Sequence, residues 1–341
     1  MSSNPLITDA HLQFNKLFKK TLGDKFTGFG EAEKFSPVQR LSLSSPSINA
    51  VLGGGVPLGR IIELYAENSV GKSTMANYLV SQFQQQGKFC LWLDAESCLD
   101  PEYLQYCGVD NNKLCLVKPT TAEETLDAAR ESLKVTDEDG NSIVSLIVID
   151  SVASLVPSDE YQKESGSGMV ASLARLLSQS LKQLSVLAAH ANCTILLLNQ
   201  KRSSNLMGYG AKTSTAGGTA LKYYASIRLE LKRSSWLEEG KVKVGQIVNL
   251  TAVKNKTAIP YVSKDFTIRF PIERNGTVFA GVDVFADIID SAIEQEIIQR
   301  TGAWYLVPSH ESKLNGLTNV YNYYLDNHDH FIQLKESLSY A

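Results

Sequence analysis

The sequence predicts an α/β fold in which a mostly parallel, twisted sheet carries helices on both faces. Short apolar segments, typical of strands buried on both faces, recur at 60–65, 89–93, 143–149 and 194–198. Segments with the apolar spacing of helices alternate with them, at 74–83, 121–134 and 170–190. A phosphate-binding loop joins the first of these strands to the first of these helices. Strands that alternate with helices in this way form parallel sheets.

The phosphate-binding loop is the most informative local pattern. It consists of Ala66, Glu67, Asn68, Ser69, Val70, Gly71, Lys72 and Ser73, and Thr74 continues the helix. Backbone N–H groups of such a loop and the helix N-terminus attract phosphates, so the nine residues are predicted to bind ATP. We expect Lys72 to reach the β- and γ-phosphates and the Ser73 hydroxyl to hold Mg²⁺. The alternative is a chance Gly-Lys-Ser in a turn between a strand and a helix.

Length and composition are those of an ordinary folded protein. The chain has 341 residues, 43% hydrophobic and 20% charged, with a net charge of −3, which gives no overall attraction to nucleic acid or membranes. It contains no apolar run long enough to span a membrane, and its N-terminus does not resemble a signal peptide, so we expect a cytoplasmic protein. The five cysteines are odd in number and lack Cys-x-x-Cys spacing, which argues against zinc and a disulfide framework.

Three polar residues follow predicted strands at the edge of the sheet where ligands bind in such folds. Asp150 stands where an acid binds Mg²⁺, although a strand-end or helix-capping role is the alternative. Glu96 is a candidate general base for an attacking water, with a salt bridge as the alternative. Gln200 could sense the γ-phosphate through its amide, although polar residues often end strands.

Beyond Gln200 the charge of the chain changes. Residues 201–256 contain eleven Lys and Arg residues and three Glu residues, a net charge of +8. Such a segment can bind a phosphate backbone, although alternating solvated strand faces would also explain part of it. Two Gly- and Ser-rich loops, predicted at 158–168 and 201–218, leave the same edge of the sheet. This arrangement suits a polymer better than a small substrate.

The chain also resembles a known family. The segments that carry the resemblance are 94–101, 148–155, 198–202, 217–226, 253–256 and 302–305, in addition to the phosphate-binding loop. In this order and at this spacing they resemble the bacterial-type RecA recombinases, of which this chain looks like a divergent or phage-borne member. One departure is the entry to the loop, Ala66-Glu67-Asn68, where the family has Gly-Pro-Glu.

The resemblance implies a domain organisation and an activity. Residues 1–38 would be an N-terminal helix and linker that docks on another subunit, 39–275 a RecA-like ATPase core, and 276–341 a small α/β C-terminal domain. The implied activity is ATP-dependent pairing and strand exchange between single-stranded DNA and a homologous duplex, with DNA-stimulated ATP hydrolysis. ATP and Mg²⁺ are the implied cofactors, a helical homo-oligomeric filament is the implied assembly, and single-strand-binding or mediator proteins are implied partners.

Roles for individual residues also follow from the resemblance. Glu96 resembles the catalytic glutamate, and Gln200 the γ-phosphate sensor. Asp100 and Tyr103 resemble the residues that contact adenine. Lys254 and Lys256 resemble a pair that reaches the ATP of the adjacent subunit, where two cations would stabilise developing phosphate charge.

The resemblance further implies DNA contacts from the two loops near 158–169 and 201–218 and from the helix between them. The residues concerned are Met169, Val170, Arg175, Lys182, Arg202, Asn205, Leu206, Met207, Gly217 and Gly218. The family inserts an aliphatic side chain between base triplets. Asn205 suits that role poorly, and Leu206 is the residue expected to take it instead.

Two other functions share these features. A ring helicase of the same fold would use an arginine finger rather than the lysine pair and would form closed hexamers. An accessory protein would bind ATP without hydrolysing it, which the altered loop entry favours and the retained Glu96 and lysines disfavour. A small-molecule kinase has no support from the two long loops.

Overall fold

The computed structural model describes residues 9–23, 37–161, 170–203, 213–274 and 277–338 and contains two compact units. The first unit, Met1–Gln39, contains helix α1 (Asp9–Leu22), which confirms the helix predicted there. Leu12, Leu17 and Leu22 of α1 are exposed within this unit. The second unit, Arg40–Ala341, contains the sheet and every residue discussed below.

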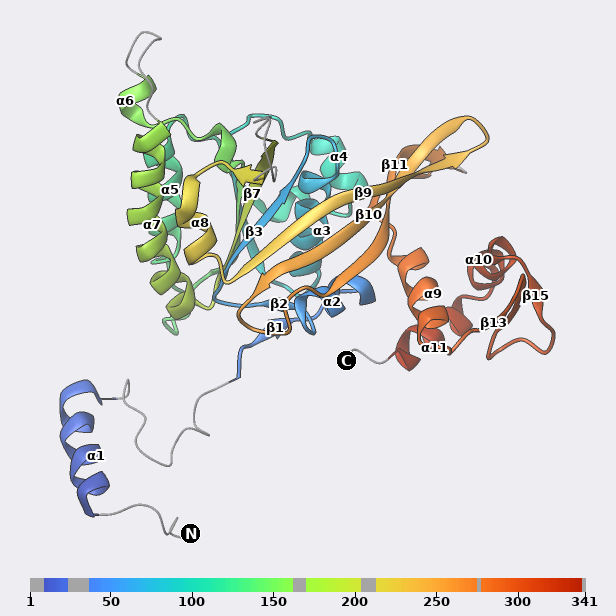
Figure 1. The fold of residues 1–341 in the computed structure, drawn as a ribbon, viewed down its shortest axis with the longest axis horizontal. Coiled ribbons are helices and arrows are strands. Elements are labelled where there is room, and N and C mark those ends of the chain that lie inside the picture. The colour runs from blue at the N-terminus through green and yellow to red at the C-terminus, as the bar shows by residue number, and fades with distance from the viewer. Residues whose placement is uncertain (1–8, 24–36, 162–169, 204–212, 275–276, 339–341) are drawn as a thin grey trace, which may run out of the picture. The chain divides into compact units, whose positions relative to one another are not determined.

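A ten-stranded sheet forms the centre of the second unit (Figure 1). Its strands are β3 (Ile61–Ala66), β4 (Phe89–Asp94), β5 (Leu114–Val117), β6 (Val144–Asp150), β7 (Thr194–Ser203), β8 (Thr213–Thr215), β9 (Ile227–Glu239), β10 (Val242–Asn255), β11 (Ser263–Arg274) and β12 (Thr277–Val282). The order is β12-β11-β10-β9-β3-β7-β6-β4-β5, and β8 pairs with β7. Strands β9 to β5 are parallel neighbours, and β9 to β12 form an antiparallel meander. The predicted α/β class is confirmed.

Helices cover both faces of this sheet. They are α2 (Pro46–Leu52), α3 (Lys72–Gln85), α4 (Pro101–Tyr106), α5 (Ala122–Ser132), α6 (Ser158–Tyr161), α7 (Val170–Ala191) and α8 (Gly218–Tyr224). One apolar cluster joins the sheet to α2, α3 and α4, and another joins it to α5, α7 and α8. Successive strand residues point to opposite faces, so Ile61 belongs to the second cluster and Ile62 to the first. Figure 1 shows α5, α7 and α8 gathered at one side of the sheet.

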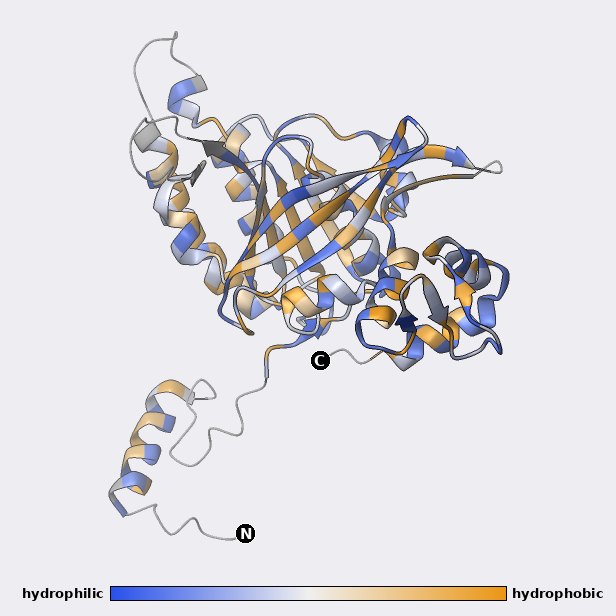
Figure 2. Ribbon diagram, turned by 45° about the vertical axis from the view of Figure 1, so that its right-hand side comes forward, coloured by the Kyte–Doolittle hydropathy of each residue, from blue (hydrophilic) through white to orange (hydrophobic). Residues whose placement is uncertain are grey.

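The antiparallel part of the sheet differs from the parallel part in its residue pattern. Every residue of β3 is buried, whereas buried and accessible residues alternate along the first half of β9. Figure 2 shows the same alternation of hydrophobic and hydrophilic residues along β9 and β10. Strands β9 and β10 therefore have one covered face and one accessible face.

The remaining elements are smaller. Strands β1 (Arg40–Leu41) and β2 (Val56–Pro57) form a two-stranded sheet. After β12 come α9 (Val284–Glu294), β13 (Gln299–Thr301), β14 (Trp304–Leu306), β15 (Leu314–Asn315), α10 (Leu317–Asp326) and α11 (His328–Ser337). An apolar cluster of their own joins α9, β14, β15, α10 and α11, while the domain boundary near 276 stays a prediction. No helix in the described part of the chain is both long and apolar enough to cross a membrane.

The two predicted loops contain more regular structure than expected. The first begins as the one-turn helix α6. In the second, β7 continues to Ser203 and pairs with β8, Lys201 lying opposite Thr215. Pairing in this way satisfies backbone groups that an open loop would leave to water. Residues 162–169 and 204–212 lie outside the described residues.

Candidate active site

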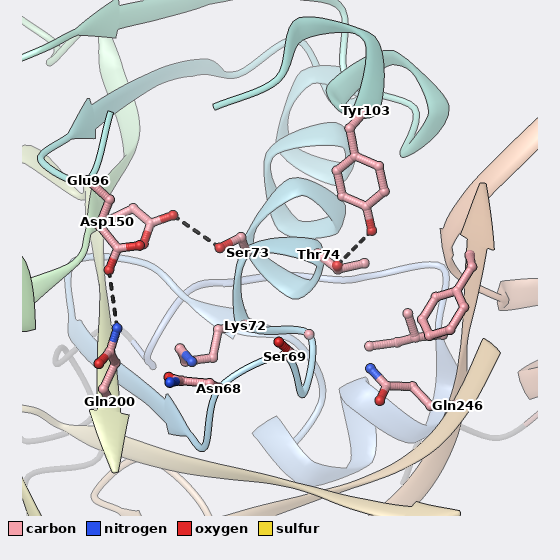
Figure 3. A pocket seen from close by; sticks show the side chains of 13 residues that line it. Asn68, Ser69, Lys72, Ser73, Thr74, Glu96, Tyr103, Asp150, Gln200 and Gln246 are labelled. Atoms are coloured by element: carbon pink, nitrogen blue, oxygen red, sulfur yellow. Dashed lines mark hydrogen bonds between the residues drawn. The ribbon is translucent and has the colours of Figure 1, made fainter. Parts of the chain in front are cut away.

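A pocket of about 430 Å³ lies at the carboxyl ends of the parallel strands. Figure 3 shows the side chains that line it, which come from the predicted phosphate-binding loop, from the strand ends and from the antiparallel strands. Its lining residues are Asn68, Ser69, Gly71, Lys72, Ser73, Thr74, Glu96, Tyr103, Asp150, Gln200, Gln246, Ile268 and Phe270. A pocket formed mainly by polar side chains beside a helix N-terminus can bind an anionic ligand.

The phosphate-binding loop, or P-loop, connects β3 to α3. Ala66 is the last residue of β3 and pairs with Gln200 on one side and Leu231 on the other. Because Ala66 has an ordinary strand backbone, its position does not require glycine. Gly71 does: its φ is 107°, and a Cβ there would lie 2.5 Å from Cδ1 of Ile268. No side chain caps the N-terminus of α3, so its first N–H groups remain available to an anion.

Lys72, Ser73 and Asp150 meet at the start of α3. The Lys72 ammonium donates to the carbonyl oxygen of Glu67 at 3.0 Å, across the P-loop. Burial lowers the pKa of Lys72, against the opposing effects of Glu96 and Asp150. The Ser73 hydroxyl donates to Oδ2 of Asp150 at 3.2 Å. Burial, and next the charge of Glu96, raises the pKa of Asp150 to about 7.

This raised pKa predicts a pH dependence of stability for the ligand-free protein. Because the folded-state pKa exceeds the unfolded value near 4, the contribution of Asp150 to stability is full below pH 4 and is lost as pH rises to about 7. Measured by denaturant unfolding, the stability of Asp150→Asn relative to wild type should rise by roughly 2–4 kcal/mol between pH 4 and pH 8. A constant difference across this range would contradict the prediction.

Glu96 is held from one side by serines that follow β6. Ser151 and Ser154 both donate to Oε1 of Glu96, the latter at 3.0 Å. The amide Nε2 of Gln200 approaches the same oxygen at 3.5 Å. Backbone bonds from the N–H groups of Ala95 and Glu96 to the carbonyl oxygen of Asp150, at 2.8 and 3.1 Å, join the ends of the two strands. The carboxylate is therefore oriented at the pocket, as a general base requires.

Tyr103 and Asp100 lie differently with respect to the pocket. The Tyr103 hydroxyl bonds to Oγ1 of Thr74 at 2.8 Å, and burial raises the pKa of Tyr103 to about 12, so the phenol is neutral. Asp100 caps the N-terminus of α4 by accepting from the N–H of Glu102 at 3.0 Å. It is not among the described residues that line the pocket.

Sequence reasoning missed three pocket residues, Gln246, Ile268 and Phe270. They come from β10 and β11, which are antiparallel strands far from the P-loop in sequence. No local motif distinguishes them, since each occupies one position of an ordinary strand pattern. Only the register of the sheet brings them to the pocket.

Comparison with known proteins gives the family. The model of the RecA N-terminal domain matches residues 8–273. The chain belongs to the RecA family of recombinases. Protein RecA of Sulfurovum sp. (strain NBC37-1) is 35% identical over 299 residues, which cover 86% of this chain and 80% of that protein. Protein RecA of Acinetobacter baumannii (strain AYE) is 34% identical over 316 residues, 92% of this chain and 84% of that protein. Among solved structures, the RadB recombinase is similar at 22% identity with a TM-score of 0.49, over 67% of this chain and 96% of that one.

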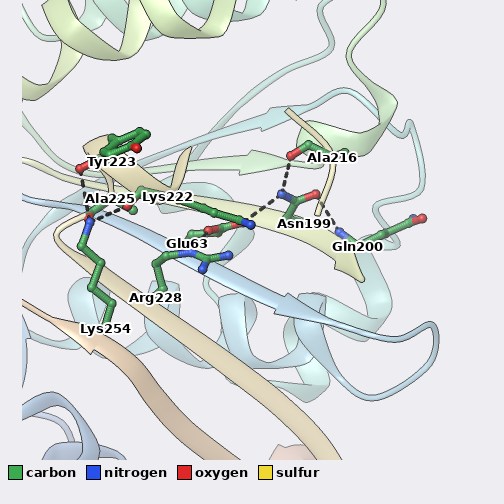
Figure 4. Close-up of polar contacts among 9 residues, drawn as sticks. All are labelled: Glu63, Asn199, Gln200, Ala216, Lys222, Tyr223, Ala225, Arg228 and Lys254. Carbon is green, nitrogen blue, oxygen red and sulfur yellow. Dashed lines mark hydrogen bonds and ion pairs between the residues drawn. The ribbon is translucent and has the colours of Figure 1, made fainter. Parts of the chain in front are cut away.

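The lysine pair predicted from the RecA resemblance is not among the described residues that line the pocket. The Lys254 ammonium donates to carbonyl oxygens at the end of α8: Lys222 at 2.6 Å, Tyr223 at 3.2 Å and Ala225 at 2.7 Å (Figure 4). Burial, and next the charge of Lys256, lowers the pKa of Lys254. Lys256 is exposed. Within one chain, Lys254 therefore acts as a cationic cap of α8.

Behind Gln200, a buried polar network joins three strands (Figure 4). Glu63 of β3 is fully buried and accepts from Arg228 of β9 at 2.5 Å and from Nδ2 of Asn199 at 3.0 Å. The same amide of Asn199 donates to the carbonyl oxygen of Ala216 at 3.0 Å, and its oxygen accepts from the N–H of Gln200 at 2.8 Å. The network thus connects Gln200 to the segment that precedes α8.

Breaking this network should lower the stability of the folded protein. Glu63→Gln leaves the Arg228 guanidinium largely buried without its carboxylate, and we expect a loss of about 3 kcal/mol in the free energy of unfolding. The matched control is Glu131→Gln, which breaks exposed ion pairs on α5 and should not change stability measurably. Urea unfolding of both variants measures the difference, and equal stabilities would contradict the prediction.

The predicted DNA contacts are partly within the described residues. Arg175 and Lys182 are exposed on α7, and Val170 is the first residue of that helix. Arg202 lies in β7, Gly217 precedes α8 with φ of 82°, and Gly218 begins α8. The remaining predicted contacts, Met169, Asn205, Leu206 and Met207, lie outside the described residues.

The Lys- and Arg-rich segment 201–256 is less uniformly positive in the structure than its composition suggested. Lys201 and Lys232 both pair with Glu230, at 2.9 and 3.0 Å, and Arg228 pairs with Glu63. These three cations are compensated within the chain because the strand register places acids beside them. The predicted basic face is thus reduced at these positions.

Proposed function

We propose that this chain is an ATP-dependent DNA recombinase that polymerises on single-stranded DNA and exchanges strands with a homologous duplex. In this proposal ATP binds at the P-loop, Glu96 activates the attacking water, and hydrolysis occurs at interfaces between subunits. Hydrolysis loosens the filament and releases DNA.

One observation carries the proposal. The P-loop, the Ser73–Asp150 pair and the oriented carboxylate of Glu96 line a single pocket. The P-loop supplies N–H donors and Lys72 for the phosphates, and the Glu96 carboxylate lines the same pocket, where it would activate the attacking water. Tyr103, Ile268 and Phe270 offer an apolar surface for a nucleobase.

Mg²⁺ fits the same pocket. The Ser73 hydroxyl and the Asp150 carboxylate are oxygen ligands of the kind that Mg²⁺ prefers, and they are hydrogen-bonded to each other. The bound ion would neutralise phosphate charge. A cation beside Asp150 would also favour the charged form of a carboxyl group that burial disfavours.

Nucleotide state can be coupled to DNA through the polar network. Gln200 touches Glu96, and its neighbour Asn199 bonds to Ala216, just before α8. A shift of Gln200 towards a γ-phosphate would therefore move the end of the second predicted DNA-binding loop. Arg175 and Lys182, exposed on α7, would add phosphate contacts, so DNA affinity should fall steeply with salt.

The test is ATP hydrolysis with and without single-stranded DNA. We expect DNA to stimulate hydrolysis by the wild type and Lys72→Ala to lose at least about 99% of the stimulated rate, because the phosphates lose their cation. Electron microscopy with ATP and DNA should show helical filaments.

Two outcomes would replace the proposal. A wild type that binds ATP but hydrolyses none on DNA would be an accessory protein. Closed hexameric rings in place of filaments would indicate a helicase.

A further inference from the structure

The hairpin of β9 and β10 carries an irregularity beside the P-loop. Arg233 pairs with Val248 and Ser235 with Ile247, which leaves Ser234 as an extra residue in β9. This is a β-bulge, which changes the face to which the following side chains point. In a regular strand, residues three apart point to opposite faces. The bulge instead brings Arg233 and Trp236 to the same face.

The side chains on this face contact the P-loop. Nη2 of Arg233 donates to the carbonyl oxygen of Ser69 at 2.6 Å, and its Nε donates to Oε1 of Gln246 at 2.7 Å. Nε2 of Gln246 in turn donates to the carbonyl oxygen of Val70 at 3.0 Å. Two successive carbonyl groups of the P-loop are therefore held by one connected pair of side chains.

Holding these carbonyl groups also orients N–H groups. In a planar trans peptide the C=O and N–H bonds point in opposite directions. The Ser69 carbonyl shares its peptide with the N–H of Val70, and the Val70 carbonyl shares its peptide with the N–H of Gly71. Both N–H groups are thereby directed away from the hairpin. These are groups of the loop expected to bind phosphate.

The backbone conformation of Ser69, which these contacts hold, is unfavourable on its own. Ser69 has φ of 58°, in the left-handed region that non-glycine residues rarely adopt. Such a residue persists when its surroundings determine it, and the bond from Arg233 acts directly on its carbonyl.

Trp236 holds the guanidinium in place. The guanidinium of Arg233 lies 4.0 Å from the centre of the Trp236 ring, and the Lys243 ammonium lies 4.1 Å from it. Gln246 is directly opposite Trp236 in the strand pairing. Arg233 is therefore stacked on Trp236 and hydrogen-bonded to both Gln246 and the P-loop. Among the described residues, Lys243 contacts the same ring but makes no hydrogen bond to the P-loop.

We propose that Arg233 and Gln246 are positioning residues that set the phosphate-binding geometry of the P-loop from the β9–β10 hairpin. This inference rests on the proposed binding of ATP at the P-loop. It assigns to the antiparallel part of the sheet a role in affinity for the nucleotide phosphates.

The test compares Arg233→Gln with Lys243→Gln, in the absence of DNA. Both variants remove one positive charge and one cation from the Trp236 ring, and only Arg233 touches the P-loop. Titration calorimetry with ADP and ATP should give dissociation constants about tenfold higher for Arg233→Gln, since a charged hydrogen bond is lost. Lys243→Gln should bind both nucleotides as the wild type does.

A competition measurement separates positioning from general damage. Adenosine, which lacks phosphates, should compete with a fluorescent ADP analogue for wild type and Arg233→Gln with the same affinity. Arg233→Lys retains the charge and should recover part of the ADP affinity. If Arg233→Gln does not fold, the ADP affinity of Arg233→Lys relative to wild type provides the test.

The outcomes distinguish this inference from the proposed function. A wild type that binds neither ADP nor ATP overturns the proposed function. If the wild type binds ADP and ATP, and Arg233→Gln and Arg233→Lys bind them with the affinity of the wild type, the inference is overturned. Equal losses of affinity for adenosine and ADP in Arg233→Gln would also overturn it.

Discussion

Glu96→Gln is expected to slow DNA-stimulated ATP hydrolysis about 10³-fold while ATP still binds. The amide cannot accept the proton of the attacking water, whereas the P-loop that binds the phosphates is unchanged. Ser151 and Ser154 can still donate to an amide oxygen at this position, so the side chain should stay in place. Filaments should persist on DNA after ATP addition, because hydrolysis no longer loosens them. The measurements are steady-state hydrolysis and nucleotide binding.

Ser154→Ala provides the control for this experiment. It removes a hydrogen bond of 3.0 Å to Glu96 and leaves the carboxylate itself. We expect a fall in rate of about tenfold or less, as for loss of one orienting bond. If Glu96→Gln kept a rate within tenfold of wild type, another group would be the base.

Mixing two inactive variants should restore hydrolysis if Lys254 acts on the neighbouring subunit. Lys72→Ala lacks a working P-loop and Lys254→Ala lacks the lysine, so each alone should be inactive on DNA. In a head-to-tail filament of both, about a quarter of the interfaces combine an intact P-loop with an intact lysine. The mixture should therefore recover up to about a quarter of the wild-type rate, measured over a range of mixing ratios.

The position of Lys254 at the end of α8 calls for a second variant. Lys254→Ala also removes the donor to three carbonyl groups, and we expect it to lower stability by about 1 kcal/mol. Lys256→Ala leaves those bonds intact and should lose DNA-stimulated hydrolysis without a change in thermal unfolding. No recovery of activity in the mixture would show that Lys254 acts only within its own chain.

The sequence alone determined those features of this protein that are formed by residues close together in the chain. The P-loop is recognisable because its strand, loop and helix are consecutive, and Asp150 and Glu96 are recognisable because each follows an apolar strand closely. Parallel strands end at the same edge of a sheet, so these local patterns were sufficient to expect a shared pocket. The helices at 74–83, 121–134 and 170–190 followed from the spacing of their apolar residues in the same way.

Only the tertiary structure decided what the antiparallel strands contribute. Gln246, Ile268 and Phe270 reach the pocket, and Arg233 reaches the P-loop, through strand register and a bulge that no local pattern reveals. The same holds for the ion pair between Glu63 and Arg228. The sequence shows a polar residue within an apolar strand but does not show which residue is its partner. These contacts join residues more than 160 positions apart, and their existence depends on packing of the whole sheet rather than on the preferences of any one segment.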